Sequence, residues 1–170
     1  MGVEAKRWRG MVGQEKYRRV MGHFATGVTV VASRRAGGEP AGLTVNALTS
    51  VSLAPPLVLI CVHRDADAHD VILQAGHFGV SFLKADQEDL ALGFSRADPE
   101  DRFQGEPVVL GPLGSPLIHG ALGWMECRVL DVHAGGDHSI IVAEVMECEA
   151  GDGDPLLFFR GSLMGSSTWR

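Results

Sequence analysis

Residues 42–62 read GLTVNALTSVSLAPPLVLICV, and this stretch decides the fold that we expect. Its first part, residues 43–53, is rich in β-branched residues and predicts a strand. Pro55 and Pro56 end that strand, because proline cannot donate to the hydrogen-bond ladder of a sheet. The run PLVLICV at 56–62 is apolar at every position, which is typical of a strand that is buried on both faces.

Strand patterns continue on both sides of this stretch. Further strands are predicted at 28–33, 78–83, 121–132, 138–148 and 155–160, separated by turns at 34–42, 134–137 and 151–154. In the strand at 121–132, Met125, Cys127 and Val129 alternate with Glu126 and Arg128, which indicates one buried face and one solvated face.

Helices are expected in three places. Tyr17, Val20, Met21 and Phe24 share one helical face, and similar spacing predicts a helix at 66–75. A third, short helix is expected at 85–94. Asp65 or Asp67 is expected to cap the second helix, and Asp86 the third. Residues 95–116 lack a periodic pattern and predict a long loop, often a binding loop or lid. Because hairpins rather than helices connect most strands, the sequence favours a mainly β fold: a closed antiparallel β-barrel with a few short helices outside.

Length and charge limit the organisation and the partners of the chain. The 170 residues fit one domain, which we place at 14–165, with a flexible basic tail at 1–13 and a short tail at 166–170. The net charge is −6 although residues 1–19 are basic, so the body is strongly acidic and nucleic acid is a poor partner.

Apolar runs and cysteines indicate a location. No run reaches the roughly 18 apolar residues of a membrane span, and no signal peptide is recognisable at the start. The three cysteines, 61, 127 and 148, each lie in an apolar stretch and are expected to pack as reduced thiols. We therefore expect a cytoplasmic protein that does not engage a membrane.

Several common catalytic motifs are absent from the sequence. It has no GxGxxG after a strand, no GxxxxGK[ST], no GxSxG and no HExxH. His133 and His138, or Cys61 and His63, could each contribute two metal ligands, but no further ligands follow at a suitable spacing, so no metal site is predicted. The protein is therefore expected either to bind a ligand only, or to rely on a cofactor for its reactivity.

Seven stretches, taken in order, carry a resemblance to a known family. They are FATGVTVVAS (24–33), GLTVNALTSVSLAPPLVLICV (42–62), HFGVSFLKADQEDLALGFS (77–95), DRFQG (101–105), ALGWMECRV (121–129), GGDHSIIVAEV (135–145) and PLLFFRG (155–161). From Tyr17 to Arg160 the chain resembles the short-chain flavin reductases, the reductase components of two-component flavin-dependent monooxygenases. The resemblance implies an FMN-binding split barrel of Greek-key type.

The resemblance also implies flavin-binding residues. Small and hydroxyl side chains would let the backbone approach the isoalloxazine ring, and backbone donors would stabilise the reduced ring. The residues implied are Thr44, Val45, Asn46, Ala47, Leu48, Ser50, Val51, Ser52, Arg64, Ala66, Phe82 and Phe103. On pattern alone, the Thr and Ser residues are equally ordinary strand residues, and Phe103 is as well explained by core packing.

A second group of residues is implied for the reduced nicotinamide. Gly136-Asp137-His138 matches the GDH motif of the family, and a hairpin turn explains the first two residues but not the histidine. The resemblance therefore implies His138 and Asp137 as NAD(P)H-binding residues, together with Arg160 and Phe24. No residue is expected to act as a catalytic acid or base, since hydride transfer depends on placing the two rings.

The chain departs from the family after the strand that ends at Val62. Relatives often carry R-x-S-x-T here for the flavin phosphate, whereas this chain reads Arg64-Asp65-Ala66-Asp67-Ala68. Two hydroxyls are missing and two carboxylates oppose a phosphate, although the following helix still offers free N–H groups. We therefore expect weak binding of FMN, or a preference for FAD.

The resemblance implies an NAD(P)H-dependent flavin reductase. It would form a homodimer, use NADH or NADPH to reduce loosely held FAD or FMN, and supply reduced flavin to a partner monooxygenase. Two alternatives stay open from the residues: an electron-transfer or sensor flavoprotein with tightly bound FMN, and a non-catalytic binding module on the same fold.

Overall fold

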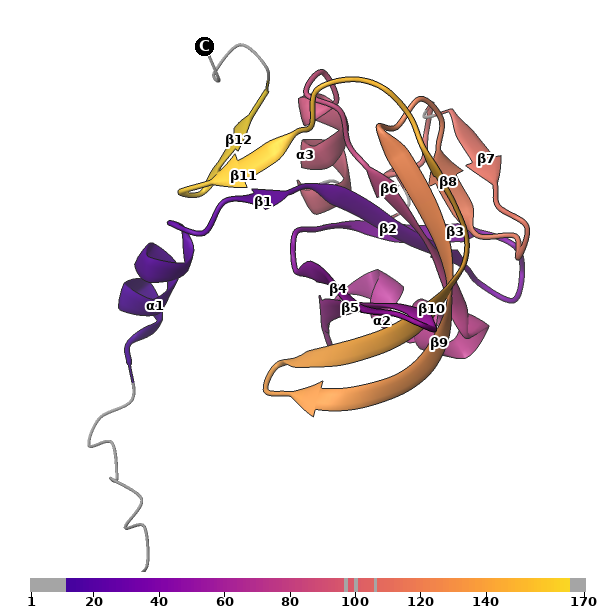
Figure 1. Ribbon diagram of the computed structural model, residues 1–170, viewed down its shortest axis with the longest axis horizontal. Helices are drawn as coiled ribbons and strands as arrows, with labels where there is room; N and C mark the ends of the chain where they lie inside the picture. Colours follow the sequence, from indigo (N-terminus) through magenta and orange to yellow (C-terminus); the bar gives the residue numbers. More distant parts are fainter. Residues whose placement is uncertain (1–11, 97, 100, 106, 166–170) are drawn as a thin grey trace, which may run out of the picture.

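The computed structural model describes residues 12–165 except 97, 100 and 106. Its main sheet has seven antiparallel strands in the order β3-β2-β6-β9-β10-β5-β4 (Figure 1). These strands are β2 (Thr29–Arg34), β3 (Pro40–Val45), β4 (Leu48–Leu53), β5 (Pro56–His63), β6 (His77–Phe82), β9 (Gly123–Gly135) and β10 (His138–Ala150). The predicted hairpins at 34–42 and 134–137 are confirmed, because β2 pairs with β3 and β9 pairs with β10.

Smaller elements surround this sheet. A three-stranded sheet joins β1 (Thr26–Gly27), β11 (Leu157–Phe159) and β12 (Ser162–Met164), and a two-stranded one joins β7 (Val108–Leu110) and β8 (Pro116–Ile118). The helices are α1 (Gln14–Met21), α2 (Asp67–Ala75) and α3 (Glu88–Arg96). The mainly β prediction is confirmed, and the loop predicted over 95–116 is wrong in its second half, which forms most of the β7–β8 hairpin.

The expectation of a closed barrel is wrong. Strands β3 and β4 are consecutive in the chain, but they occupy the two opposite ends of the sheet order. The run predicted as one strand over 43–53 is interrupted at Asn46–Ala47, and each half has a different partner: β3 pairs with β2, and β4 pairs with β5. Because the backbone of each half is hydrogen-bonded to its own hairpin partner, the two edges stay separate and leave a split between them.

The core lies in two clusters. The larger one packs α2 against the inner face of the sheet, with Ile60, Ile72, Phe78 and Val80 fully buried. The smaller one packs α3 against β2 and the 156–163 segment, around Val30, Leu83, Phe94 and Leu156. At roughly 1.5–3 kcal/mol for each fully buried large apolar side chain, these clusters provide the main stabilisation of the domain.

The helix predictions need three corrections. Helix α1 buries no residue and ends at Met21, so Phe24 lies outside it and is 69% exposed. Figure 1 shows α1 standing apart from the main sheet. Neither Asp65 nor Asp67 caps α2, whose N-cap is Ala66 without a side-chain hydrogen bond. Helix α3 begins at Glu88, beyond Asp86; the side chain of Gln87 accepts a hydrogen bond from the Lys84 N–H at 2.8 Å.

Glu126 contradicts the alternation predicted for β9. Its side chain is fully buried, whereas its neighbour Met125 is only partly buried. The carboxylate accepts hydrogen bonds from the backbone N–H groups of Leu113 and Ser115 at 2.6 and 2.7 Å. A Cβ at Gly111 would lie 2.5 Å from a carboxylate oxygen, so any larger residue there would displace the Glu126 carboxylate. Glu126 therefore holds the turn between β7 and β8 against the sheet.

The three cysteines differ more than the sequence indicated. Cys127 is buried and Cys61 half-buried, but Cys148 is exposed, so packing of all three as buried thiols is wrong for Cys148. Burial raises the pKa of the Cys127 thiol to about 12, and the Glu126 carboxylate adds to the rise.

We expect Cys148 to react with Ellman's reagent at least about a hundredfold faster than Cys127, because the thiolate is the reacting form and is nearly absent at Cys127. The release of the coloured thiolate at mildly alkaline pH measures both rates. In the variant Cys148→Ser the fast phase should disappear. A fast phase that survives this change contradicts the assignment.

Candidate functional site

The split between β3 and β4 carries the segment predicted to contact flavin. Thr44 and Val45 end β3, Asn46 and Ala47 cross the split, and Leu48 begins β4. Val45 is buried in the core, and the Thr44 hydroxyl donates to the Ala91 carbonyl at 2.6 Å, so Thr44 faces α3. Asn46 and Ala47 are exposed, and β4 has a strand partner on one side only within the described part of the chain. Backbone donors and acceptors are thus available along this edge.

A cavity of about 410 Å³ lies at one end of the split. Thr44 and Asn46 line it from the sheet, Ala91 and Ser95 from α3, and Phe158 from β11. Of the other predicted flavin residues, Ser50, Val51 and Ser52 lie farther along β4, the first two exposed and Ser52 half-buried. Phe82 lines a separate apolar cavity of about 530 Å³ with Trp124 and Cys148, so the structure does not group Phe82 with the split.

The N-terminus of α2 follows directly on β5 and provides a site for an anion. Because the Ala66 side chain cannot cap the helix, the N–H groups of Asp67 and Ala68 are left for a ligand, whereas the His69 N–H donates to the Ala66 carbonyl at 2.9 Å. Arg64, predicted to bind the flavin phosphate, is placed by its own N–H, which donates to the Asp137 carbonyl at 3.0 Å. The helix start and the β9–β10 turn are therefore held side by side.

Asp67 opposes an anion less than the sequence indicated. Its two carboxylate oxygens each accept a hydrogen bond from an Arg35 Nη at 2.8 Å, so its charge is paired. Sequence reasoning missed Arg35, since nothing in the pattern of a hairpin turn shows that it reaches a helix 32 residues away. Of the two acids expected to weaken phosphate binding, Asp65 is therefore the one whose side chain stays exposed, at 93%.

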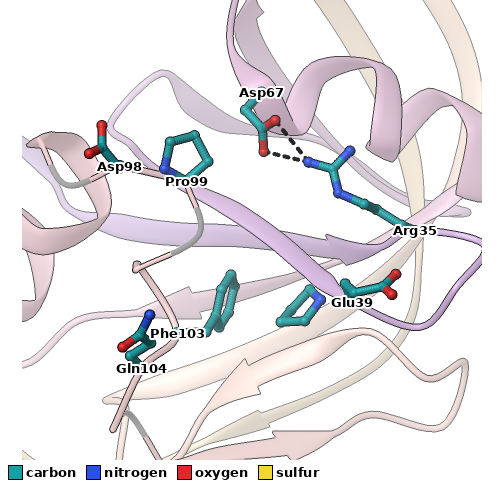
Figure 2. Close-up of a pocket in the computed structure, with 8 residues that line it drawn as sticks. Arg35, Glu39, Asp67, Asp98, Pro99, Phe103 and Gln104 are labelled. Atoms are coloured by element: carbon teal, nitrogen blue, oxygen red, sulfur yellow. Dashed lines mark hydrogen bonds and ion pairs between the residues drawn. The ribbon is translucent and has the colours of Figure 1, made fainter.

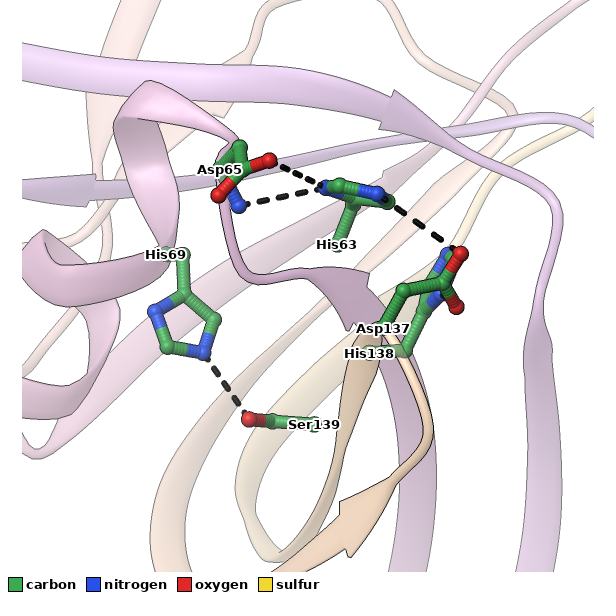
Figure 3. A network of polar contacts seen from close by, with 6 residues as sticks. All are labelled: His63, Asp65, His69, Asp137, His138 and Ser139. Carbon is green, nitrogen blue, oxygen red and sulfur yellow. Dashed lines mark hydrogen bonds and ion pairs between the residues drawn. The ribbon is translucent and has the colours of Figure 1, made fainter.

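Asp137 and His138 form the polar tip of the β9–β10 hairpin (Figure 3). His138 Nδ1 lies 2.7 Å from an Asp137 carboxylate oxygen, and this hydrogen bond is the largest cause of the lowered pKa of Asp137. An ionised Asp137 accepts the Nδ1–H and leaves Nε2 of His138 for a ligand. His63 lies opposite on β5, with its ring centroid 5.0 Å from that of His138 and its Nε2 3.8 Å from Asp137. Sequence reasoning considered His63 only as a metal ligand.

His69 and Ser139 lie behind this tip and were missed by sequence reasoning. His69 Nε2 is 2.9 Å from the Ser139 hydroxyl and Nδ1 is 2.7 Å from Asp70 (Ser139 and His69 appear in Figure 3). The order Ser–His–Asp is that of a hydrolase triad, but Ser139 is only 6% exposed, so a substrate carbonyl could not reach its hydroxyl. The contact instead joins α2 to the start of β10.

Three other predicted residues lie away from the tip. Arg160 occupies the turn between β11 and β12, where its N–H donates to the Gly22 carbonyl at 2.9 Å. Phe24 lies just before β1, which belongs to the three-stranded sheet with β11 and β12. Figure 1 shows this sheet far from the β9–β10 turn. Within one chain, Phe24 and Arg160 therefore do not meet His138. Phe103 borders a third cavity, beside the N-terminus of α2.

Among the residues that the structure describes, no three His, Cys, Asp or Glu side chains are grouped as possible metal ligands. The described residues around the split can bind an anion at the start of α2, present backbone groups to a planar ligand along β4, and hydrogen-bond through His138.

Comparison with known proteins gives a consistent result. Residues 21–167 match the family described as the flavin reductase like domain. The chain is 48% identical over 133 residues to an NADH-dependent FAD reductase of Streptomyces globisporus, covering 76% of this chain and 72% of that protein. It is 41% identical to the reductase component of a 4-nitrophenol 4-monooxygenase/4-nitrocatechol 2-monooxygenase of Rhodococcus opacus, covering 86% and 77%. The solved structure of the Streptomyces globisporus C-1027 NADH:FAD oxidoreductase with NAD and FAD fragments superposes with a TM-score of 0.83 at 41% identity, covering 91% and 94%.

Proposed function

Because this chain belongs to the flavin reductase like family, we propose that it reduces FAD or FMN with NAD(P)H by hydride transfer, an activity of class EC 1.5.1.-, and supplies reduced flavin to a partner monooxygenase. The observation that carries the proposal is the contact between the N-terminus of α2 and the Asp137–His138 turn. In the proposed site, the start of α2 binds an anion and the His138 imidazole hydrogen-bonds from the neighbouring turn.

The residues present fit a flavin. The uncapped start of α2 suits its phosphate, and Arg64 adds a cation. Small side chains at Ala47 and Ser50 leave the β4 backbone open to a flat ring. Asp65 weakens the phosphate site, in keeping with a flavin that binds as a diffusible substrate.

The protein contributes placement rather than acid–base chemistry. When bound, the flavin and the nicotinamide supply the hydride chemistry, and the rate depends on how closely the two rings are held. Asp137 fixes the ring of His138, and Arg64 N–H fixes Asp137 relative to α2. In the proposed site, His138 Nε2 donates to or accepts from the carboxamide or pyrophosphate of NAD(P)H.

The function is tested by following NADH and NADPH oxidation while FAD and FMN are each titrated. Turnover that depends on added flavin supports a reductase. A protein that purifies with firmly bound FMN and gains no activity from free flavin is instead an electron carrier or sensor. Absence of flavin binding and of turnover contradicts both and leaves a binding module.

We expect His138→Ala to raise the Michaelis constant for NADH roughly tenfold, which corresponds to the loss of one charge-assisted or well-placed hydrogen bond. Steady-state rates at saturating flavin give this constant. The matched control is His133→Ala, since His133 is an exposed histidine on the same hairpin, with its Nε2 3.3 Å from the Asp131 carboxylate. An unchanged Michaelis constant in the His138 variant removes His138 from the site.

We also propose that the chain forms a homodimer. Strand β5 is apolar on both faces, and its inner residues Val58, Ile60 and Val62 are buried. Its outer residues Leu57, Leu59 and Cys61 are only half-buried, so the sequence prediction of a strand buried on both faces is met on one face alone. A strand of this composition is typical of one covered on both sides.

The apolar surface extends beyond β5. Ile140 and Val142 of β10 lie directly opposite Cys61 and Leu59, and are also half-buried. Leu130 and Val51, about half exposed, lie at β-bulges of the flanking strands β9 and β4. We name the group formed by Leu57, Leu59, Cys61, Ile140 and Val142 the outer apolar face. A second copy on this face would border β4 and would bring its own residues close to the segment predicted to contact flavin, residues 44–52.

No helix among the described residues is long and apolar enough to cross a membrane. The three cysteines are unpaired in the structure. Free thiols fit a reducing compartment, and on that basis we propose a cytoplasmic location.

A further inference from the structure

A cavity of about 440 Å³ lies at the C-terminal end of α2. It is enclosed by the β2–β3 turn, the last turn of α2, the start of β6 and the β7–β8 turn. The volume is within the roughly 300–1,000 Å³ of sites that hold small molecules. The wall formed by the β7–β8 turn is fixed, because the Glu126 carboxylate accepts hydrogen bonds from the N–H groups of Leu113 and Ser115.

The charge of the lining distinguishes this cavity from the rest of the chain. The net charge of the protein is −6, yet the ionisable residues of the lining are Arg34, Arg35 and His77. None of the described residues that line the cavity is acidic. The Glu39 carboxylate lies beside Gly37, but it lines the cavity at the start of α2 instead. A basic recess in an acidic protein selects a small anion.

Arg34 provides a cation without a counterion. It ends β2, is half-buried, and its Nε donates to the Gly38 carbonyl at 2.8 Å. This hydrogen bond fixes the guanidinium at the turn and leaves its two Nη groups for a ligand. No carboxylate of the described residues pairs with Arg34, whereas Arg35 and Arg128 each have an ion pair. A half-buried guanidinium of this kind favours an oxyanion, which it can bind through two parallel hydrogen bonds.

His77 and Gln74 add two hydrogen-bonding groups. Continuing the β2–β6 register by two residues places His77 directly opposite Arg34, so their side chains lie on one side of the sheet. His77 Nδ1 lies 2.7 Å from the Ser115 hydroxyl, which leaves Nε2 for a ligand. Gln74 is exposed on the last turn of α2 and lines the cavity from the helix side. A ligand with several acceptor oxygens can therefore be held from two sides.

Arg35 reaches from this cavity toward the start of α2 (Figure 2). Its Nη2 donates to both Asp67 oxygens at 2.8 Å, so its charge is already paired and Arg34 is the main cation of the cavity. At 1.5 Å per residue, the nine residues of α2 separate the two ends of the helix by roughly 12 Å. An anion at the C-terminal end therefore leaves the N–H groups at the start of α2 free.

Apolar side chains distinguish between kinds of oxyanion. Val71 and Leu113 line the cavity beside the basic groups, and Leu113 is 41% exposed. Inorganic phosphate offers no carbon to this surface, whereas the carbon chain of an organic acid is stabilised when it leaves water there. The lining therefore favours a carboxylate with a short carbon chain.

From these observations we propose that the cavity at the C-terminal end of α2 binds a small aliphatic carboxylate, as a ligand separate from flavin and NAD(P)H. One carboxylate group accepts hydrogen bonds from the two Nη groups of Arg34. A second oxygen-bearing group hydrogen-bonds with His77 Nε2 and the Gln74 amide, and the carbon chain lies against Leu113. Binding changes no covalent bond of the ligand, and it does not depend on the proposed reductase function.

Succinate is the probe, and calorimetry on the full chain at constant ionic strength measures its binding. We expect one site per chain with a dissociation constant of about 1 mM or below, which two or three charge-assisted hydrogen bonds can provide. Succinamide, which has the same shape without the charge, should bind at least about tenfold more weakly. Inorganic phosphate should bind at least about threefold more weakly, because it lacks the carbon chain. Saturating FMN should leave the affinity for succinate unchanged.

Two variants and their matched controls locate the site. Arg34→Gln should raise the dissociation constant for succinate at least about tenfold, because the charged fork is lost. Arg18→Gln, at an exposed arginine of α1, should leave it unchanged. Gln74→Glu adds a carboxylate to the lining without altering the β2–β3 turn, and should weaken binding at least about tenfold by repulsion. Gln14→Glu adds the same charge at an exposed position of α1 and should have no effect.

Each outcome decides the proposal. A wild-type protein that does not bind succinate overturns it, as does equal binding of succinamide. Displacement of succinate by FMN also overturns it, since the anion would then lie at the start of α2. Unchanged affinity in Gln74→Glu overturns it even where circular dichroism shows that Arg34→Gln does not fold. Phosphate that binds as tightly as succinate overturns the assignment to a carboxylate.

Discussion

Glu126→Ala is expected to lower the free energy of unfolding by about 3 kcal/mol, because it leaves one buried and one partly buried backbone N–H group without an acceptor, at roughly 1–3 kcal/mol for a buried group and less for the partly buried one. Those groups belong to Leu113 and Ser115, which the Glu126 carboxylate binds at 2.6 and 2.7 Å. The carboxylate also fills the space above Gly111, so its removal leaves a void. Thermal or urea denaturation followed by circular dichroism measures the loss, which corresponds to a melting temperature roughly 10 °C lower.

Two further variants make this prediction specific. Glu126→Gln keeps the volume but replaces one acceptor oxygen by an N–H₂ group, so a smaller loss is expected. Glu144→Ala removes a glutamate of the neighbouring strand whose partner is Arg128, at 2.7 Å with the arginine side chain 55% exposed. Such a pair contributes less than about 1 kcal/mol. Equal losses for Glu126→Ala and Glu144→Ala would falsify the role given to Glu126.

Leu59→Glu is expected to convert the proposed homodimer into monomers and to reduce flavin reductase activity at least tenfold. Leu59 lies at the centre of the outer apolar face, opposite Val142. A two-fold interface contains the substituted position twice, and each buried leucine contributes about 2 kcal/mol, so the dissociation constant should rise roughly a thousandfold. Size-exclusion chromatography with light scattering measures the mass, and NADH oxidation with added flavin measures the activity.

The control for this substitution is Leu110→Glu. Leu110 is 58% exposed on β7, outside the outer apolar face. It should leave both mass and activity as in the wild type. A wild-type protein that is monomeric at micromolar concentration, or a Leu59→Glu variant that stays dimeric, contradicts the proposed interface. A monomeric variant with full activity contradicts the partner's contribution to the site.

The proposed dimer would explain why the residues predicted to bind the nicotinamide lie apart in one chain. Phe24 and Arg160 lie on the small sheet and His138 on the hairpin turn, and one chain does not bring them together. If all three bind the same nicotinamide, as the family resemblance implies, they must come from different copies. The mass and activity of Leu59→Glu therefore also test whether the site is shared.

Local sequence was sufficient for the strands and for the hairpin turn that carries Asp137 and His138 of the candidate site. Alternating and β-branched runs predicted the strands of the main sheet, and the Gly-Gly-Asp turn predicted the β9–β10 hairpin that presents Asp137 and His138. These signals are short-range, because backbone preference and turn chemistry depend on a few neighbouring residues. The apolar run at 56–62 is another such signal, since its composition alone indicates a strand that needs cover on both faces.

Tertiary structure alone decided the partners. The run at 43–53 has the pattern of one strand, yet Asn46–Ala47 divides it between the two edges of an open sheet. Each half pairs with its own neighbour in the chain, β2 or β5, and strands β6, β9 and β10, which come later in the sequence, separate these two hairpins. The alternating pattern of its strand predicts that Glu126 faces solvent, but Glu126 is buried in the structure. Its carboxylate is accommodated there because a loop 11–13 residues away provides two N–H groups that donate to it. From the sequence, Asp67 is expected to repel a phosphate, but in the structure its charge is paired with Arg35. The sequence by itself therefore determined the strand pattern and the family, whereas the open split, the buried carboxylate and the paired acid depend on contacts that form only when the chain folds.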